Sequence, residues 1–338
     1  DENYEKMSKS KGNVVSPEEV LEEFPVDAAR YWCAGSSVGD DLPFKKNDLR
    51  SGRKLMTKLW NASKLVGELS GEEQVENPGE LDPIDRWMLA ELDRNIEEIT
   101  DHMEEYEFAK ARNRLREFFW HTYCDNYLEI AKQKLDGEDS RSTRYALQQT
   151  HRAFLKLFAP FLVHITEEIW HDMYNRKDTG SIHLQNWPEP RGIEADLEEG
   201  ENAMDAIHAL RKYKSDHQMA PTEELELVEV YSDISGFEEA VKEAMHLEQL
   251  QVHEGSPDVA EEIDTIQLDY EKVGPAYGEL VSDMEAALDE DDYELEDGEL
   301  HLAGETLQDD EFKVERNRTY RGEGEMVEAG DVTLIVRS

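Results

Sequence analysis

The chain has 338 residues and a formal net charge of −44, from 80 acidic and 36 basic side chains. Its length predicts two or three domains, because single hydrophobic cores stop growing at about 250 residues. It contains no apolar run of about 18 residues, and its two cysteines, Cys33 and Cys124, form no Cys-x-x-Cys pair. These features exclude a membrane-spanning helix, a disulfide framework and a cysteine zinc site within this chain, and we expect a cytoplasmic protein.

The acidic side chains are concentrated toward the C-terminus. Residues 1–64 hold 11 basic and 11 acidic side chains, residues 65–190 hold 14 and 26, and residues 191–338 hold 11 and 43. So acidic a surface repels itself in dilute salt but is screened at about 1 M salt, where the Debye length is about 3 Å. We therefore expect an extreme halophile as the source. A disordered acidic tail is the alternative, although aromatic residues and apolar periodicity continue through the region.

The first part of the chain predicts a loop followed by helices. Ser16 has the position of an N-cap, with Pro17 at the first helical position and Glu19 completing a capping box. Three helices are expected, over residues 17–24, 26–34 and 49–69. Glycine and proline among the acids of residues 70–83 are typical of a linker, and we place a domain boundary there.

The middle of the chain has the apolar periodicity of long helices. Met88, Leu92, Ile96 and Ile99 recur at spacings of three and four, which marks one face of an amphipathic helix. Three helices are expected, over residues 84–103, 108–135 and 142–174. Pro160 should kink or split the last of them. Long helices with short joints predict an antiparallel bundle, which an extended segment over residues 180–190 closes.

Beyond residue 191 the pattern changes to helices that alternate with short strands. Helices are expected over residues 201–217, 235–247 and 277–288. Strands are expected over residues 225–231, 250–253, 299–302, 311–316 and 331–337, and residues 263–270 continue the same unit. The predicted fold class is therefore mainly α with α/β. Residues 1–69 form the loop and a helical connection, residues 70–190 a helix bundle, and residues 191–338 a small acidic α/β region.

The loop that starts at Lys6 has a composition suited to phosphate. It reads Lys-Met-Ser-Lys-Ser-Lys-Gly-Asn. Lysine supplies compact positive charge, serine hydroxyls and backbone N–H groups add donors, and Gly12 allows the loop to change shape. A lone basic loop of this kind is more often solvated surface, so composition alone leaves both interpretations open.

The start of this loop carries a family signature. Lys6, Met7, Ser8, Lys9 and Ser10 are identical to the Lys-Met-Ser-Lys-Ser motif of class I aminoacyl-tRNA synthetases, which the chain therefore resembles. The resemblance implies a loop that closes over ATP while the amino-acid carboxylate attacks the α-phosphate. Lys9 and Lys6 become the candidate catalytic residues, because they would stabilise charge on the leaving pyrophosphate. ATP is an expected substrate with Mg²⁺ as its companion, and no metal site is predicted within this chain.

Further segments resemble landmarks of the valine, isoleucine and leucine subgroup of this family. They are residues 39–44, 58–63 and 82–87. Residues 119–129 and 165–170 look most like those of the valine enzymes. The resemblance implies activation of valine with ATP and its transfer to tRNA(Val), by a monomer whose residues 84–190 bind the anticodon and whose residues 14–69 connect them to a catalytic domain. An isoleucine enzyme and a non-catalytic tRNA-binding fragment stay as alternatives.

The chain begins at Asp1 rather than at methionine, and the signature follows within ten residues, so we interpret it as the C-terminal part of a longer enzyme. The family's His-x-Gly-His-type signature, amino-acid pocket and editing domain would all precede Asp1. This segment alone should therefore not aminoacylate. The C-terminus lacks the basic coiled coil of many bacterial valine enzymes, and residues 273–278 instead resemble the extension of archaeal-type enzymes.

Two local basic runs are candidates for tRNA contacts: Lys110, Arg112, Arg114 and Arg116 in the first, and Arg211, Lys212 and Lys214 in the second. RNA recognition combines such cations with stacking on unpaired bases. Both runs could instead pair with neighbouring carboxylates, which is the commoner arrangement. The net charge of zero over residues 1–64 favours a location there for the phosphates of ATP and tRNA.

The uneven charge predicts an uneven response to salt. At about 0.01 M salt the Debye length is about 30 Å, so nearly every carboxylate of residues 191–338 repels every other. This repulsion should exceed the stability of a domain, which is only about 5 to 15 kcal/mol, and the C-terminal region should loosen first. Circular dichroism and hydrogen exchange across a salt series test this. Equal protection of all regions at low salt would contradict the charge argument and the halophile assignment.

Overall fold

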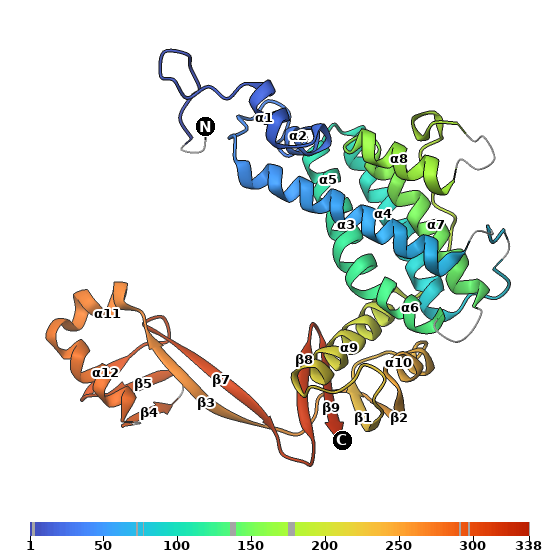
Figure 1. Cartoon of the computed structure of the whole chain (residues 1–338). Coiled ribbons are helices and arrows are strands. Elements are labelled where there is room, and N and C mark those ends of the chain that lie inside the picture. The colour runs from blue at the N-terminus through green and yellow to red at the C-terminus, as the bar shows by residue number, and fades with distance from the viewer. Residues whose placement is uncertain are drawn as a thin grey trace.

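The computed structural model describes residues 1, 4–71, 74–76, 78–135, 140–174, 180–290, 292–296 and 298–337. Figure 1 shows an N-terminal loop with two short helices, a bundle of long helices, and a mixed region that ends in a unit carried on a two-stranded ribbon. Helices dominate up to residue 216 and strands are added after it, so the predicted class, mainly α with α/β, is confirmed. No helix of the described residues combines the length and the apolar character needed to cross a membrane.

The predicted capping box begins α1 (Pro17–Glu23). The Ser16 hydroxyl accepts the Glu19 N–H at 3.2 Å, and the Glu19 carboxylate accepts the Ser16 N–H at 3.4 Å. Two of the N–H groups that a helix start leaves unpaired are satisfied in this way. The next helix, α2 (Val26–Cys33), follows Pro25. Both helices pack on a small apolar cluster that contains Phe24, Ala28, Phe44 and Leu49.

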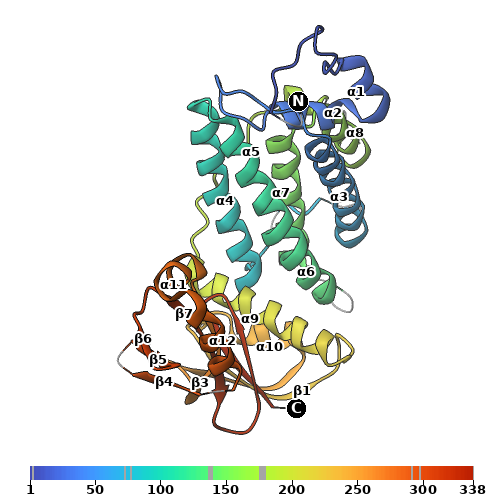
Figure 2. The ribbon, with the colours of Figure 1, turned by 90° about the vertical axis from the view of Figure 1, so that its left-hand side faces the viewer.

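The bundle consists of α3 (Lys46–Ser70), α4 (Pro83–Glu104), α5 (Phe108–Glu117), η1 (Phe118–Tyr127), α6 (Leu128–Leu135), α7 (Arg141–Phe158) and α8 (Val163–Met173). Figure 2 shows α3, α7 and α4 side by side along the length of the bundle, and α7 contacts both of the others. Pro160 splits the predicted third helix into α7 and α8, as expected. The predicted helix over residues 108–135 is continuous, but its middle, η1, is π-helical.

Aromatic side chains from η1 and α7 fill the centre of the bundle. The Phe119 ring centroid lies 5.2 Å from that of Phe154 and 5.4 Å from that of Phe158, and both pairs meet edge to face. Tyr123 and Tyr127 stack with centroids 6.0 Å apart. All five are fully buried. Aromatic pairs in these geometries contribute about 0.5 to 1.5 kcal/mol beyond their buried area, so these five rings stabilise the core of the bundle.

A four-stranded sheet of order β2-β1-β9-β8 follows the bundle and packs with α9 (Leu197–Asp216) and α10 (Glu238–Met245). β1 (Leu225–Tyr231) is parallel to β2 (Leu247–His253) and antiparallel to β9 (Val332–Arg337), which pairs with β8 (Glu325–Ala329). The apolar core of this sheet is continuous with that of the bundle. A short 3₁₀ turn, η3 (Ile182–Leu184), interrupts the segment that was predicted to be extended between them.

An antiparallel ribbon of β3 (Val259–Leu268) and β7 (Phe312–Tyr320) leads away from the sheet and carries residues 270–307, which we call the distal unit. It contains α11 (Tyr270–Tyr277), η4 (Gly278–Leu280), α12 (Val281–Asp289), β4 (Tyr293–Glu296), β5 (Glu299–Leu302) and β6 (Glu305–Leu307). Its core is a separate cluster that includes Val273, Met284 and Leu300. The predicted helix over residues 277–288 starts too early, because Gly278 ends α11 with φ of +55°.

A histidine is buried without charge between α3, α7 and α8. His151 is fully buried and its ring nitrogens lie 2.8 Å from the Ser63 hydroxyl and 2.7 Å from the Tyr174 hydroxyl. Because the Ser63 hydroxyl donates to the Leu59 carbonyl, it accepts from His151 Nε2–H, and Tyr174 then donates to Nδ1. Burial lowers the pKa of His151 to about 3.

This histidine should make the bundle less stable in acid. Between about pH 6.5 and pH 3 the unfolded chain binds a proton on His151 that the folded chain excludes, so the free energy of unfolding falls as pH falls. His151→Gln should flatten that dependence by up to about 1.4 kcal/mol per pH unit, although it lowers stability at neutral pH. Denaturant unfolding across this pH range measures the slope, with His121→Gln, a change at an exposed histidine, as control. An unchanged slope in His151→Gln would refute the neutral, buried state.

Candidate functional site

The signature loop, Lys6–Ser10, is anchored by one side chain and exposes its lysines. Met7 packs on the apolar cluster of α1 and α2, while Lys6 and Lys9 are exposed. Within the described part of the chain, no ion pair joins either lysine to a carboxylate. The loop can therefore offer two unpaired ammonium groups from a fixed base.

A side chain that the sequence analysis did not single out closes this loop. The Asn13 side-chain carbonyl accepts the Ser8 N–H at 2.9 Å, and its NH₂ group donates to the Lys6 carbonyl at 3.4 Å. Gly12 has φ of +71°, a conformation that favours glycine. The Lys-Gly-Asn sequence after the signature was visible, but its role as a closing turn depends on these contacts. Lys11 differs from the signature lysines because it pairs with Glu5 at 3.1 Å.

A cavity of about 770 Å³ lies beside the signature loop, between α1, α2 and the end of the bundle. Its lining includes Met7, Leu21, Trp32 and Phe108, with Arg30 as the only charged residue among those that line it. Such a lining favours apolar groups over phosphate. The cavity therefore suits an apolar group better than a triphosphate.

The first basic run does not form one cationic patch. Lys110 pairs with Glu107 at 2.7 Å, and Arg114 pairs with Glu98 at 2.8 Å. Arg112 is half-buried and donates to the Tyr31 carbonyl at 2.8 Å. Burial lowers the pKa of its guanidinium. Arg116 lies 5.5 Å from the centroid of the Trp120 ring.

The second basic run is also divided by the fold. Lys214 is 2% exposed, and its ammonium donates to the carbonyls of Pro221, Glu223 and Met245 at 3.2, 2.5 and 2.7 Å. Arg211 is half-buried, and desolvation lowers its pKa. Lys212 is exposed. These hydrogen bonds of Lys214 hold the turn after α9 against α10, so the role of this lysine is structural.

A larger group of cations lies on α3, where the sequence analysis named no candidate. This helix has six basic and two acidic side chains, a net charge of +4 in a chain of −44. Arg50, Arg53, Lys54 and Lys64 are exposed and share one face, which we call the α3 cationic face. No ion pair joins these four to a carboxylate among the described residues. The face is about 21 Å long, at 1.5 Å per residue.

Neighbouring side chains extend this face toward η1. Lys58 lies 4.3 Å from the Trp120 ring centroid and pairs with Asp125 at 2.6 Å. Together with Lys54 and Asn61, these residues line a groove of about 660 Å³ between α3 and η1. The ring of half-buried Trp120 thus has both Lys58 and Arg116 close to it, and Lys54 of the α3 cationic face lines the same groove. Cations next to an aromatic ring are the combination that binds single-stranded RNA.

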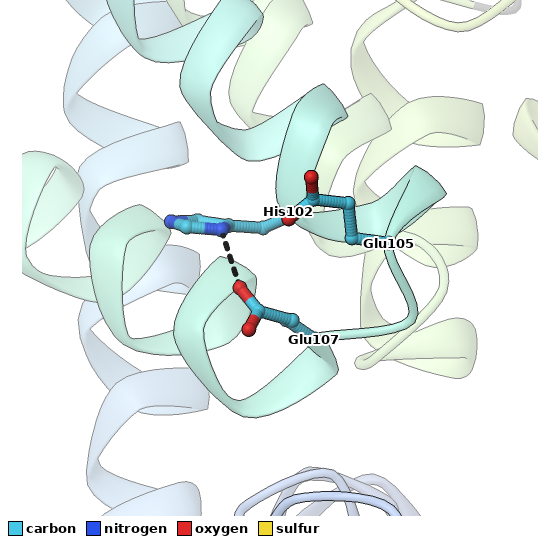
Figure 3. A group of neighbouring side chains, drawn as sticks. All are labelled: His102, Glu105 and Glu107. Carbon is cyan, nitrogen blue, oxygen red and sulfur yellow. Dashed lines mark hydrogen bonds and ion pairs between the residues drawn. The ribbon is translucent and has the colours of Figure 1, made fainter.

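One group of side chains in the described residues has the spacing of metal ligands. His102, Glu105 and Glu107 place one ligand atom each within 4.8 Å of one another at the turn between α4 and α5 (Figure 3). His102 Nδ1 lies 3.1 Å from a Glu107 oxygen, and the other Glu107 oxygen takes the Lys110 ammonium. The Lys110 bond is the main cause that lowers the pKa of Glu107. His102 and Glu107 therefore already have partners within the protein, and Lys110 competes with any ion for Glu107.

Two family models match the chain. Residues 1–45 match the model described as tRNA synthetases class I (I, L, M and V), and residues 85–230 match the anticodon-binding domain of tRNA ligase. The first match covers the signature loop, α1 and α2. The second begins in α4 and ends in β1, so it includes the bundle helices from α4 onward, together with α9.

Similar proteins are named valine–tRNA ligases. The chain is 52% identical over 337 residues to that of the halophilic archaeon Haloarcula marismortui, a match that covers 100% of this chain and 37% of that protein. It is 35% identical to that of Pyrococcus furiosus, with coverage of 98% and 39%, and 35% identical to that of Methanothermobacter thermautotrophicus, with 94% and 36%. The chain thus spans less than half the length of these curated relatives.

Proposed function

The chain belongs to the class I tRNA synthetases, and from this premise we propose that it is the C-terminal part of a valine–tRNA ligase. In the full-length protein it supplies the loop that closes over ATP and the surface that binds tRNA(Val). The observation that carries the proposal is the signature loop, whose Lys6 and Lys9 are exposed and unpaired while Met7 holds its base.

The proposed reaction activates valine before its transfer to tRNA. The valine carboxylate attacks the α-phosphorus of ATP, the bond to the β-phosphate oxygen breaks, and pyrophosphate leaves with its electron pair. Lys9 stabilises the charge that develops on pyrophosphate, and Lys6 assists. Met7, Ser8 and Ser10 complete the loop that contacts ATP. Mg²⁺ accompanies ATP as a substrate, and the residues of this chain hold the phosphates.

The proposal assigns tRNA binding to two surfaces. The bundle takes the anticodon end, and the α3 cationic face contacts backbone phosphates between that end and the signature loop. Arg116 and exposed Lys212 stay as candidates for further contacts, while Lys110, Arg112 and Arg114 would first have to leave their present partners. Lys214 is assigned no RNA contact because its ammonium is buried on three carbonyls.

The same proposal divides the chain at residues 69 and 190, into the loop with its helical connection, the bundle, and the acidic C-terminal region. The full-length protein is proposed to act as a monomer in the cytoplasm, where ATP, valine and tRNA are available.

Loss of the Lys9 charge should slow valine activation. Removing one group that stabilises developing charge costs a factor of about 100 to 1,000, so Lys9→Ala in the full-length protein should lower valine-dependent pyrophosphate exchange by about 100-fold or more. Lys11→Ala is the matched control, because Lys11 is paired with Glu5 and should matter far less. The tRNA affinity should change little in both. Exchange with isoleucine and leucine tests the amino acid, and an unchanged rate in Lys9→Ala would remove the ATP role.

Loss of charge on the α3 cationic face should lower the affinity for tRNA and make that affinity depend less steeply on salt concentration. Lys54→Gln/Lys64→Gln should reduce the slope of log affinity against log salt by about 0.7 to 0.9 for each phosphate that is no longer neutralised. Lys313→Gln/Arg316→Gln removes equal charge from exposed positions of β7 and should leave the slope unchanged. The measurement is tRNA(Val) binding by the full-length protein over the salt range in which it stays folded. If the two double variants change the slope equally, tRNA affinity depends on the total charge of the protein and not on the α3 cationic face.

A further inference from the structure

Helix α8 receives its N-terminal cap from a distant helix. Its own N-cap residue, Leu162, makes no side-chain hydrogen bond. One carboxylate oxygen of Asp27, on α2, accepts the backbone N–H groups of His164 and Ile165 at 3.0 and 2.9 Å. The other Asp27 oxygen lies 2.8 Å from the His164 ring nitrogen Nδ1. The Asp27 side chain is buried, so water cannot replace these bonds. A carboxylate here also interacts favourably with the positive end of the helix dipole.

Two arginines tie α2 to the bundle as well. Arg30 donates to the Pro160 carbonyl at 2.9 Å, in the turn that separates α7 from α8. Arg112 of α5 donates to the Tyr31 carbonyl, and its guanidinium lies 4.5 Å from the centroid of the Tyr31 ring. Gly35 leaves room for this guanidinium, since a Cβ there would collide with it. Helix α2 is therefore held by polar bonds to two separate parts of the bundle.

The opposite side of α2 supports the signature loop. Ala28 belongs to the apolar cluster on which Met7 packs, and Trp32 meets Phe44 of the same cluster edge to face at 5.4 Å. A continuous set of contacts thus runs from the start of α8, through Asp27 and the body of α2, to Met7. The exposed lysines of the loop flank that methionine on the chain.

We infer that α2 is the joint that positions the signature loop relative to the bundle, and that Asp27 is the positioning residue of this joint. Asp27 does not touch ATP; it acts by fixing α2, on which the base of the loop rests. The inference rests on the proposed function, because it assigns to the joint the correct placement of Lys6 and Lys9 on ATP.

The test compares two chemically matched variants of the full-length protein. Asp27→Asn removes the negative charge and replaces one of the two acceptor oxygens, which hold the α8 N–H groups and the His164 ring, with an NH₂ group. Asp93→Asn is the control: Asp93 is 6% exposed and likewise accepts two backbone N–H groups, of Arg191 and Ile193 at 2.9 and 3.0 Å, but it does not hold α2. Both variants should lose thermal stability.

The expected difference is in catalysis. At temperatures where both variants are folded, Asp27→Asn should lower kcat/KM for ATP in valine-dependent pyrophosphate exchange by about tenfold. Loss of a helix cap costs free energy of about the size that corresponds to this factor. The Kd for tRNA(Val) should not change. Asp93→Asn should leave kcat/KM for ATP unchanged. If Asp27→Asn does not fold, Arg30→Gln at the exposed end of the joint should give a smaller fall of the same kind.

Two outcomes would overturn the inference: wild-type kcat/KM for ATP in folded Asp27→Asn, or equal falls in Asp27→Asn and Asp93→Asn, which would indicate a general loss of stability. Absence of valine-dependent exchange in the unmodified protein is a different result. It would refute the proposed function itself, whatever the variants do.

Discussion

Competition between carboxylates and phosphates for the same cations governs where this protein can bind a polyanion. With 80 acidic and 36 basic side chains, carboxylates outnumber the cations, and a cation held in an ion pair must leave its carboxylate before it can bind phosphate. The contacts sort the cations on this basis. Lys6, Lys9 and the α3 cationic face are exposed without ion pairs among the described residues, whereas Lys110 and Arg114 are paired. Both unpaired groups lie in the first 64 residues, where the net charge is zero.

Helix α3 extends from the region of the signature loop into the bundle, and it carries the α3 cationic face along its length. Its 25 residues span about 37 Å, and its buried face packs on α2, α7 and α8. One end lies near the cluster that carries Met7, and the other lies in the bundle. The bundle shares its core with α9 and the sheet, so these parts form one packed body, while the distal unit has a core of its own. The α3 cationic face therefore lies on the part of the molecule that has the larger apolar core.

Local signals in the sequence predicted local structure well. The Ser16 capping box, the split at Pro160 and the strand Leu225–Tyr231 follow from caps, proline and alternation, which involve neighbours on the chain. The π-helical η1 could not be predicted, because apolar residues four apart, such as Phe119 and Tyr123, suit an α-helix equally. The distal unit was harder, since its three-stranded sheet consists of strands of three or four residues.

Contacts between distant residues limited the prediction of the site. The signature lysines could be chosen from an exact motif, but the fate of Lys214 depends on three carbonyls from other segments, and Asp27 caps a helix 137 positions away. Neither has a local signal. The α3 cationic face did have one: counting charge helix by helix would have revealed six basic against two acidic side chains. The broader count over residues 1–64 concealed it, because α1 contributes only acidic charge.

The central claim is that the unpaired cations of the first 64 residues, Lys6, Lys9 and those of the α3 cationic face, mark the path of the phosphates. A structure of the full-length protein with tRNA(Val) and a non-hydrolysable ATP analogue tests it most directly, by measuring distances from phosphate oxygens to lysine and arginine nitrogens. The account predicts distances below about 4 Å at Lys9 and at two or more residues of the α3 cationic face. RNA bound along the distal unit, with the α3 cationic face still open to solvent, would contradict it.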